Sequence, residues 1–393
     1  MSDVAMSESE LAELHRELRV VARDLLRRNA AKAGPDQTYP TVDWSLLVDT
    51  GWLGLEIPEE FDGAGATFAE VAVVLHELGR AAASTPYLGT AVLGVGALGL
   101  LEAGAARDEL LRAVAAGEQR PALALPTGDS DGDVTAFRLA AAPVSEGDQP
   151  GAGRMVVSGS ADFVPDAAGA DRILLLAADE SGTPVVVAVR PTDPGVTVSD
   201  RPVLDETRHL GTVVVEGTEV DPGAVWRFRG TDPAASAASA RRLLDRAALA
   251  VACDSLGLAE AMLEATVEYA GTRRQFGRPI GSFQAVKHAC ADMHVKITVG
   301  RELLAAAVRA LAAAEDPAGP HDQEISVAVS RAKSYLGAAA VDIAGAAMQL
   351  HGGIGYTWEG GVHVYLKRAL LGRSLFGAPA AHRARLAARF TAL

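Results

Sequence analysis

Apolar residues recur every three or four positions along the first part of the chain, most clearly in residues 9–31 and 68–84. This spacing places apolar side chains on one face of an α-helix. Between these segments, residues 51–67 (GWLGLEIPEEFDGAGAT) contain glycines and Pro58, which favour a loop. The pattern predicts an N-terminal helical domain over residues 1–120.

The pattern changes between residues 121 and 232. Short β-branched runs appear there, separated by the Gly, Pro and Asp residues that are typical of turns. The clearest runs are RMVVSGSADFVP, RILLLAA, PVVVAVR and TVVVEG. They predict a small middle β domain, built as a barrel or a sandwich, in which residues 148–153 (DQPGAG) form a hairpin loop.

From residue 233 to residue 393 the chain returns to long helices rich in alanine and leucine. Glycines and prolines interrupt them at residues 272–282, 315–322 and 351–361. The order of helical, β and helical segments predicts an α+β fold whose C-terminal domain is a helical bundle.

The composition argues against some kinds of binding partner and some cellular locations. The formal net charge is -14, which argues against nucleic acid or an anionic membrane as the main partner. The two cysteines, Cys253 and Cys290, lie in helical patterns and indicate reduced thiols, and no metal-ligand spacing is present. The N-terminus lacks the apolar region of a secretory signal, and the apolar run at residues 90–101 is too short for a membrane span. These features predict a cytoplasmic protein.

One basic segment stands out in this acidic chain. Residues 273–288 read RRQFGRPIGSFQAVKH. Gly277, Pro279 and Gly281 cannot sit inside a stable helix, so the segment is predicted to be a loop, with a new helix beginning at Ser282. Arginines beside the free amides at the start of a helix bind anions, and a diphosphate is a suitable ligand for such a site. An ordinary interhelical turn with solvated arginines is the alternative.

A second glycine-containing segment follows an apolar helix at residues 348–355 (MQLHGGIG). The adjacent glycines, Gly352 and Gly353, allow a ligand to approach the backbone closely, and Gln349 could form a hydrogen bond with it. A helix C-cap explains the same glycines equally well.

Together with residues 51–80, these two segments closely resemble the acyl-CoA dehydrogenase family. The resemblance implies a helical domain, a β domain and a C-terminal four-helix domain, assembled as a dimer or tetramer with FAD at a subunit interface. It implies that FAD contacts are made by Arg273, Phe276, Gln284, Gln349, Gly352 and Gly353. The implied reaction removes the α-proton of an acyl-CoA thioester and transfers the β-hydride to the flavin, and an electron-transferring flavoprotein takes the electrons.

The family's catalytic base is missing from both of its usual positions. A gapless alignment places Phe376 where much of the family has a glutamate, and Ala247 where other members have one. Neither side chain can accept a proton. The middle domain departs as well, because Pro165 replaces a threonine that bonds the flavin, and residues 124–133 (ALPTGDSDGD) replace a motif at the flavin and substrate.

Asp254 is the candidate for a non-standard base, since it lies two helical turns beyond Ala247. A helix-packing or inter-subunit hydrogen bond is the simpler interpretation, because an aspartate among apolar residues needs a partner. Three hypotheses follow: a base-lacking partner in a heteromeric dehydrogenase, which is preferred; a self-sufficient enzyme that uses Asp254 or another residue; and a non-enzymatic scaffold that binds no flavin.

Overall fold

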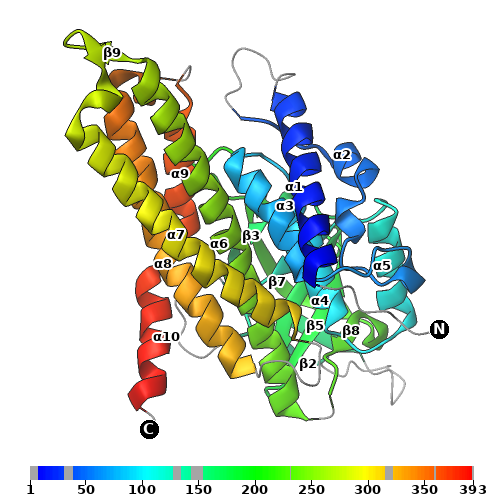
Figure 1. The fold of residues 1–393 in the computed structure, drawn as a ribbon. Coiled ribbons are helices and arrows are strands. Elements are labelled where there is room, and N and C mark those ends of the chain that lie inside the picture. The colour runs from blue at the N-terminus through cyan, green and yellow to red at the C-terminus, as the bar shows by residue number, and fades with distance from the viewer. Residues whose placement is uncertain are drawn as a thin grey trace.

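The structure is a computed structural model that describes residues 8–30, 39–126, 134–142, 154–230, 232–314, 322–357 and 360–391. Helices of the N-terminal part lie beside a sheet, and the bundle of long C-terminal helices packs directly against these N-terminal helices (Figure 1). The predicted order of helical, β and helical segments is therefore confirmed, and so is the α+β class. Among the described residues, no helix is long and apolar enough to cross a membrane.

The N-terminal part is helical as predicted. Its helices are α1 (Glu8–Ala30), α2 (Trp44–Asp49), α3 (Phe68–Arg80), α4 (Val95–Gly99) and α5 (Ala105–Ala115), with a π-helical turn, η3 (Leu88–Gly94). Helix α3 begins with a capping box, in which Thr67 and Glu70 satisfy each other's backbone amides. Helix α1 is held on α3 by the ion pair between Arg23 and Glu77, at 2.9 Å.

The middle part forms one eight-stranded sheet with the strand order β6-β7-β3-β2-β4-β5-β8, and β1 pairs with β4 in parallel. The strands are β1 (Pro121–Ala124), β2 (Phe137–Ala141), β3 (Met155–Pro165), β4 (Arg172–Ala178), β5 (Pro184–Val189), β6 (Val196–Asp200), β7 (Leu210–Val220) and β8 (Val225–Arg227). The predicted hairpin at 148–153 lies outside the described residues.

Successive side chains of β4 are buried on both faces of the sheet, which explains its unbroken apolar run. Ile173 and Leu175 join a core formed by the strands themselves, whereas Leu174 and Leu176 belong to the larger core shared with the helices. One face of the sheet therefore packs against the helical parts of the chain, and the other encloses a separate core within the β part.

The C-terminal part contains α6 (Pro233–Thr272), α7 (Gln284–Ala312), α8 (Asp322–His351), α9 (Val362–Ser374) and α10 (Pro379–Thr391). A short hairpin of β9 (Arg274–Gln275) and β10 (Arg278–Pro279) joins α6 to α7 at the far end of the bundle (Figure 1). The interruption predicted at 272–282 is confirmed. Helix α7 begins at Gln284 rather than Ser282, because residues Ile280–Ser282 form a separate 3-10 turn.

Helices α3 and α6 cross each other at an unusually short distance. A Cβ atom placed on Gly257 would lie 1.9 Å from the carbonyl oxygen of His76, and one on Gly79 would lie 2.1 Å from the carbonyl oxygen of Asp254. Both obstacles are backbone atoms, which cannot rotate away. The crossing therefore requires glycine on each helix.

Replacing Gly257 by alanine is expected to destabilise the protein, because the added methyl group forces α3 and α6 apart. Overpacking of this kind typically costs about 1–3 kcal/mol, and contact with backbone places this site at the upper end or beyond. The midpoint of chemical unfolding, followed by circular dichroism, measures the loss. Gly271→Ala is the matched control on the same helix, since nothing lies within 4 Å of its Cβ position. Equal midpoints for the two variants would contradict the close crossing.

Candidate active site

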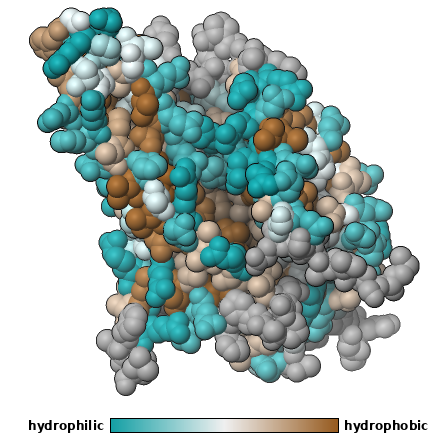
Figure 2. Space-filling model, in the orientation of Figure 1, coloured by the Kyte–Doolittle hydropathy of each residue, from teal (hydrophilic) through white to brown (hydrophobic). Residues whose placement is uncertain are grey.

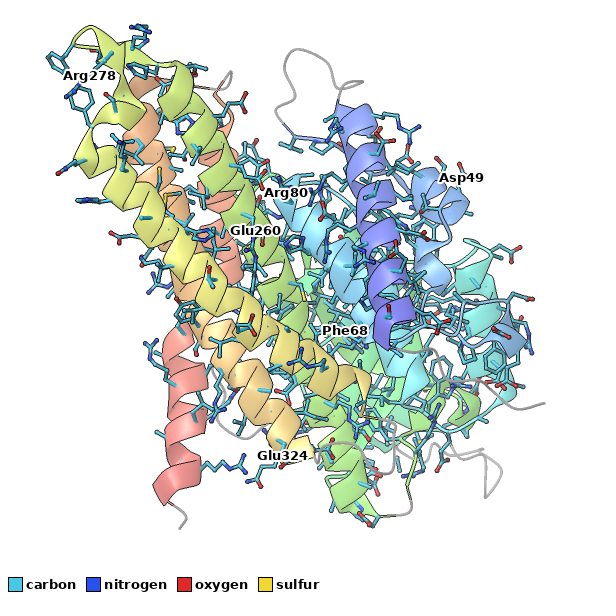
Figure 3. All side chains as sticks on the ribbon, viewed as in Figure 1. Asp49, Phe68, Arg80, Glu260, Arg278 and Glu324 are labelled. Atoms are coloured by element: carbon cyan, nitrogen blue, oxygen red, sulfur yellow. The ribbon has the colours of Figure 1, made fainter. Side chains whose placement is uncertain are left out.

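The basic segment forms the exposed β9–β10 hairpin, and Figure 3 shows Arg278 at its tip. The ring of Phe276 is 91% exposed, and its backbone has a φ of 52°, a region that phenylalanine rarely adopts. The guanidinium of Arg278 lies 4.1 Å from the ring centroid of Phe283. The hairpin thus presents an aromatic ring and arginines at the surface of the chain.

The second predicted segment lies at the same end of the long helices. The ring of His351, at the end of α8, stacks on Tyr269 of α6 with 4.5 Å between the centroids. Tyr269 in turn accepts the backbone N–H of Arg273, the first residue of the basic segment. The stacked pair therefore connects the two segments that the sequence analysis selected.

The surface around Gly352 and Gly353 is open. Gly352 has a φ of 61°, and no atom lies within 4 Å of a Cβ placed on either glycine. Gln349 is exposed beside them. Free space above backbone, an exposed amide and nearby guanidinium groups fit the adenosine diphosphate part of a dinucleotide. The residues of this end of the molecule therefore fit that half of FAD.

The region expected to face a flavin ring has a different character. Pro165 ends β3 and is buried, and its carbonyl oxygen lies 2.5 Å from the Cβ position of Gly89. Asp166 follows it and accepts a hydrogen bond of 2.7 Å from the N–H of Gly89. Pro165 offers neither a hydroxyl nor an N–H group there. Residues 127–133, most of the other altered motif, lie outside the described residues.

Burial raises the pKa of Asp166 to about 7, although the Gly89 amide and Arg208 oppose the shift. The protonated form is therefore the stable one below the folded pKa. The contribution of Asp166 to the free energy of unfolding is fully present below the unfolded pKa, near 4, and is lost as pH rises through about 7.

At pH values above 7, Asp166→Asn is expected to raise the temperature midpoint of unfolding. The amide keeps a hydrogen-bond acceptor for Gly89 and carries no charge there. The difference from the unmodified chain should disappear below about pH 4, where both side chains are neutral. Thermal unfolding across this pH range measures the effect. A difference that does not change with pH would show that the charge of Asp166 is not its cause.

Both positions that the gapless alignment assigns to the base carry buried apolar side chains. Ala247 on α6 is fully buried, and Phe376 is 5% exposed in the loop after α9. The buried amine of Lys333 donates to the carbonyl oxygens of Gly372 at 2.8 Å and Gly377 at 3.1 Å. His382 Nε2 lies 3.0 Å from the carbonyl oxygen of Phe376. The loop is thus held firmly, but it presents no carboxylate at position 376.

Asp254 is held by two arginines. Its Oδ1 lies 2.6 Å from Nη2 of Arg368 and 3.0 Å from Nη2 of Arg208. Burial by itself would raise the pKa of Asp254, but Arg368 and Arg208 outweigh that effect and hold the pKa below its usual value. An ion-paired carboxylate with a low pKa is a poor proton acceptor. The geometry fits the helix-packing interpretation of Asp254.

Arg368 is the central residue of this buried network, and the sequence analysis missed it. Its Nη1 donates to the carbonyl oxygen of Ala83 at 3.0 Å and contacts the hydroxyl of Thr207 at 2.5 Å. The network therefore joins the N-terminal part, the loop before β7, α6 and α9. A charged residue among the apolar positions of α9 was the available signal.

Asp245 is a second buried carboxylate that the sequence analysis missed. It lies in a cavity of about 300 Å³ whose lining includes Arg241, Arg385 and Ser330. Burial raises the pKa of Asp245 to about 6, although the hydroxyl of Ser326 donates to it. A carboxylate with this pKa can exchange a proton near neutral pH, and the arginines can bind an anion.

Two hydrogen bonds of His382 connect this cavity to the loop of Phe376. Ser330 lines the cavity and lies 3.2 Å from Nδ1 of His382, whose other ring nitrogen contacts the carbonyl oxygen of Phe376. Asp245 itself does not replace the missing base. It lies two residues from Ala247, so the two side chains point in roughly opposite directions from α6.

Comparisons with known proteins agree with these features. Two family models match the chain, the acyl-CoA dehydrogenase N-terminal domain over residues 8–118 and the acyl-CoA dehydrogenase C-terminal domain over residues 237–391. The acyl-CoA dehydrogenase IpdE2 of Mycobacterium tuberculosis is 32% identical over 366 residues, which cover 88% of this chain and 90% of that relative. Within the described residues, no group of His, Cys, Asp or Glu could hold a metal ion.

Solved structures lead to the same family. The ChsE4-ChsE5 complex of Mycobacterium tuberculosis contains a chain that superposes with a TM-score of 0.78 at 26% identity, covering 99% of both chains. The steroid dehydrogenase variant Tcur3481-Tcur3483 gives a TM-score of 0.78 at 28% identity, over 98% of this chain and 100% of the other. The chain belongs to the acyl-CoA dehydrogenase family of oxidoreductases.

Proposed function

We propose that this chain is the base-lacking subunit of a heteromeric, FAD-dependent acyl-CoA dehydrogenase. The observation that carries the proposal is the filling of both base positions by buried Ala247 and Phe376, while the segments suited to adenosine diphosphate remain exposed. In this assignment a second family member supplies the carboxylate that removes the α-proton of the thioester. This chain completes the flavin site.

When bound, FAD supplies the acceptor for the β-hydride of the acyl group. The role of this chain is to hold the far end of the cofactor. Arg273 pairs with the diphosphate, Phe276 covers an apolar part of the ligand, and Gln284 and Gln349 provide hydrogen bonds. Gly352 and Gly353 leave the space that the ligand needs. The hydroxyl absent at Pro165 indicates that the partner contributes the contacts to the flavin ring.

The cavity of Asp245 is assigned to the coenzyme A part of the substrate. Arg241 and Arg385 suit the phosphate groups of coenzyme A, and the hydrogen bonds of His382 connect the cavity to the loop of Phe376. Asp245 accepts a hydrogen bond from a ligand amide or hydroxyl, and it does not remove the α-proton.

Two observations support a heteromeric assembly. Figure 2 shows apolar surface along the long C-terminal helices, and their exposed apolar residues include Val267, Val295 and Val299. Such residues on neighbouring helices favour burial against another subunit. Both solved relatives described above carry two names, as expected of two-component assemblies, and one is named a steroid dehydrogenase. A sterol-derived acyl group is therefore the favoured substrate class, with an electron-transferring flavoprotein as the acceptor.

A self-sufficient enzyme that uses Asp254 is the weaker alternative, because both arginines on Asp254 favour its ionised, paired state. A scaffold without flavin is the other alternative. It would leave the exposed Phe276 and the open surface at Gly352 without an occupant.

The flavin-to-protein ratio tests the proposal. We expect the purified chain to be colourless by itself and yellow when it is coexpressed with a family member that has the base. Arg273→Ala should lower the flavin content of the complex, because the loss of one charge-assisted contact weakens binding by about tenfold. Arg138→Ala, at an exposed position of strand β2, is the control.

The possible outcomes distinguish the three hypotheses. A chain that binds flavin stoichiometrically and turns over substrate by itself would refute the base-lacking assignment. A complex that contains no flavin in any combination would support the scaffold. Unchanged flavin in the Arg273→Ala complex would refute the assignment of the basic hairpin.

A further inference from the structure

A cavity of about 350 Å³ lies away from the Asp245 cavity, between the N-terminal part and α6. Its lining contains four arginines, Arg107, Arg229, Arg242 and Arg246, and one carboxylate, Glu56. This concentration of positive charge is unexpected in a chain with a formal net charge of -14. A group of arginines at a cavity is typical of an anion-binding site.

Arg246 uses the Glu56 carboxylate completely. Arg107 and Arg242 are paired with Asp108 and Asp322, which do not line the cavity. Both terminal nitrogens of Arg246 contact Glu56, and its Nε donates to the carbonyl oxygen of Val92 at 2.6 Å. The same guanidinium lies 4.8 Å from the ring centroid of Phe68, at the start of α3 (Figure 3). The pair between Arg246 and Glu56 therefore forms a fixed, charge-balanced wall.

Two other arginines keep unused donors. Arg107 donates through Nε to Leu98 at 3.0 Å and through Nη1 to Asp108 at 2.6 Å, so its Nη2 makes no hydrogen bond within the described part of the chain. Arg242 contacts Asp322 through Nε at 3.0 Å and through Nη2 at 2.7 Å. Its Nη1 likewise makes no hydrogen bond to any described residue. Both side chains line the cavity, so their remaining donors are available to a ligand there.

The rest of the lining is largely apolar. Phe68, Val95, Leu100 and Leu311 contribute to it, and Gly96 and Gly99 add no side chains. The volume lies in the range of small-molecule sites, about 300–1,000 Å³. An apolar body with one negative end therefore matches both halves of the lining.

We propose that this cavity binds a small amphipathic carboxylate, whose carboxylate group contacts Arg107 and Arg242. The ligand is either a free carboxylic acid or the distal carboxylate of an acyl chain. The inference does not depend on flavin or on the partner subunit, because all the residues that it uses belong to this chain.

Isothermal titration calorimetry with hexanoate tests the site on the full chain, or on its complex if the chain requires the partner. We expect saturable binding of hexanoate and none of hexylamine, which has the same apolar body and the opposite charge. Arg242→Gln should weaken hexanoate binding about tenfold, the effect of losing one charge-assisted hydrogen bond. Arg242→Lys should recover part of the loss, since it keeps the charge without the planar fork. Arg138→Gln is the control.

A second titration distinguishes the two sources of the carboxylate. Binding of S-adipoyl-pantetheine that depends on Arg242, without binding of hexanoate, would identify the distal carboxylate of an acyl chain. Hexanoate binding that depends on Arg242 identifies a free acid. The proposal is overturned if neither compound binds, if hexylamine binds equally well, or if Arg242→Gln changes nothing while its unfolding midpoint remains that of the unmodified chain.

Discussion

Replacing Arg368 by methionine is expected to remove a large part of the folding stability. Arg368 and Asp254 are 2% and 3% exposed, so the substitution leaves a buried carboxylate with Arg208 as its remaining cation. Removing one partner of a buried ion pair typically costs about 3–5 kcal/mol, out of a total stability of about 5–15 kcal/mol. The variant also loses the bonds to Ala83 and Thr207, which connect three parts of the chain. The midpoint and slope of urea unfolding measure the loss.

Lys367→Met is the matched control, at the next position on α9. Lys367 lies 3.5 Å from Glu206, whose side chain is 51% exposed, so this contact is worth about 0–1 kcal/mol. If both variants unfold at the midpoint of the unmodified chain, Arg368 does not stabilise the junction of the three parts. A second test combines Arg368→Met with Asp254→Leu, which should recover part of the stability, because the buried carboxylate is removed while Arg208 loses its contact with it.

The second large effect concerns turnover. We expect no acyl-CoA dehydrogenation by the purified chain, and activity once the partner is present. Changing the partner's base from glutamate to glutamine should lower kcat by about 10²–10⁴-fold, the contribution of a positioned general base. The oxidation of acyl-CoA with an artificial electron acceptor measures the rate.

The same assay examines the carboxylates of this chain. Asp245→Asn should raise KM with little change in kcat, because Asp245 lies in the proposed coenzyme A cavity and points away from the base position. The exposed Asp24→Asn variant on α1 is the control. A loss of kcat in Asp245→Asn equal to that of the partner variant would assign the base to this chain and refute the heteromeric mechanism.

Local patterns were sufficient to predict the long helices and some of the strands. The three- and four-residue apolar spacing predicted the helices, and the β-branched runs predicted β3, β4, β5 and β7, because these periodicities directly reflect which face of an element is buried. The interruption at 272–282 was predictable from Gly277 and Pro279 alone. The helix start was placed two residues early, since the intervening 3-10 turn has no distinct sequence pattern.

The proposed adenosine diphosphate residues were selected from local sequence as well, and they remain predictions. Their motifs are contiguous, and the structure gives them exposed positions at one end of the bundle. The proximity of the two motifs could not be read from the sequence, because it depends on the stacking of His351 on Tyr269.

The sequence by itself determined the order of the helical and β segments, the family resemblance and the absence of a carboxylate at positions 247 and 376. Only the tertiary structure decided the state of the other carboxylates. Asp254 is paired with Arg368, which lies 114 residues away in the sequence, and Asp245 is buried in a cavity built by α6, α8 and α10. The pKa of a carboxylate depends on its burial and on the charges around it, and both are set by segments that are distant in the chain.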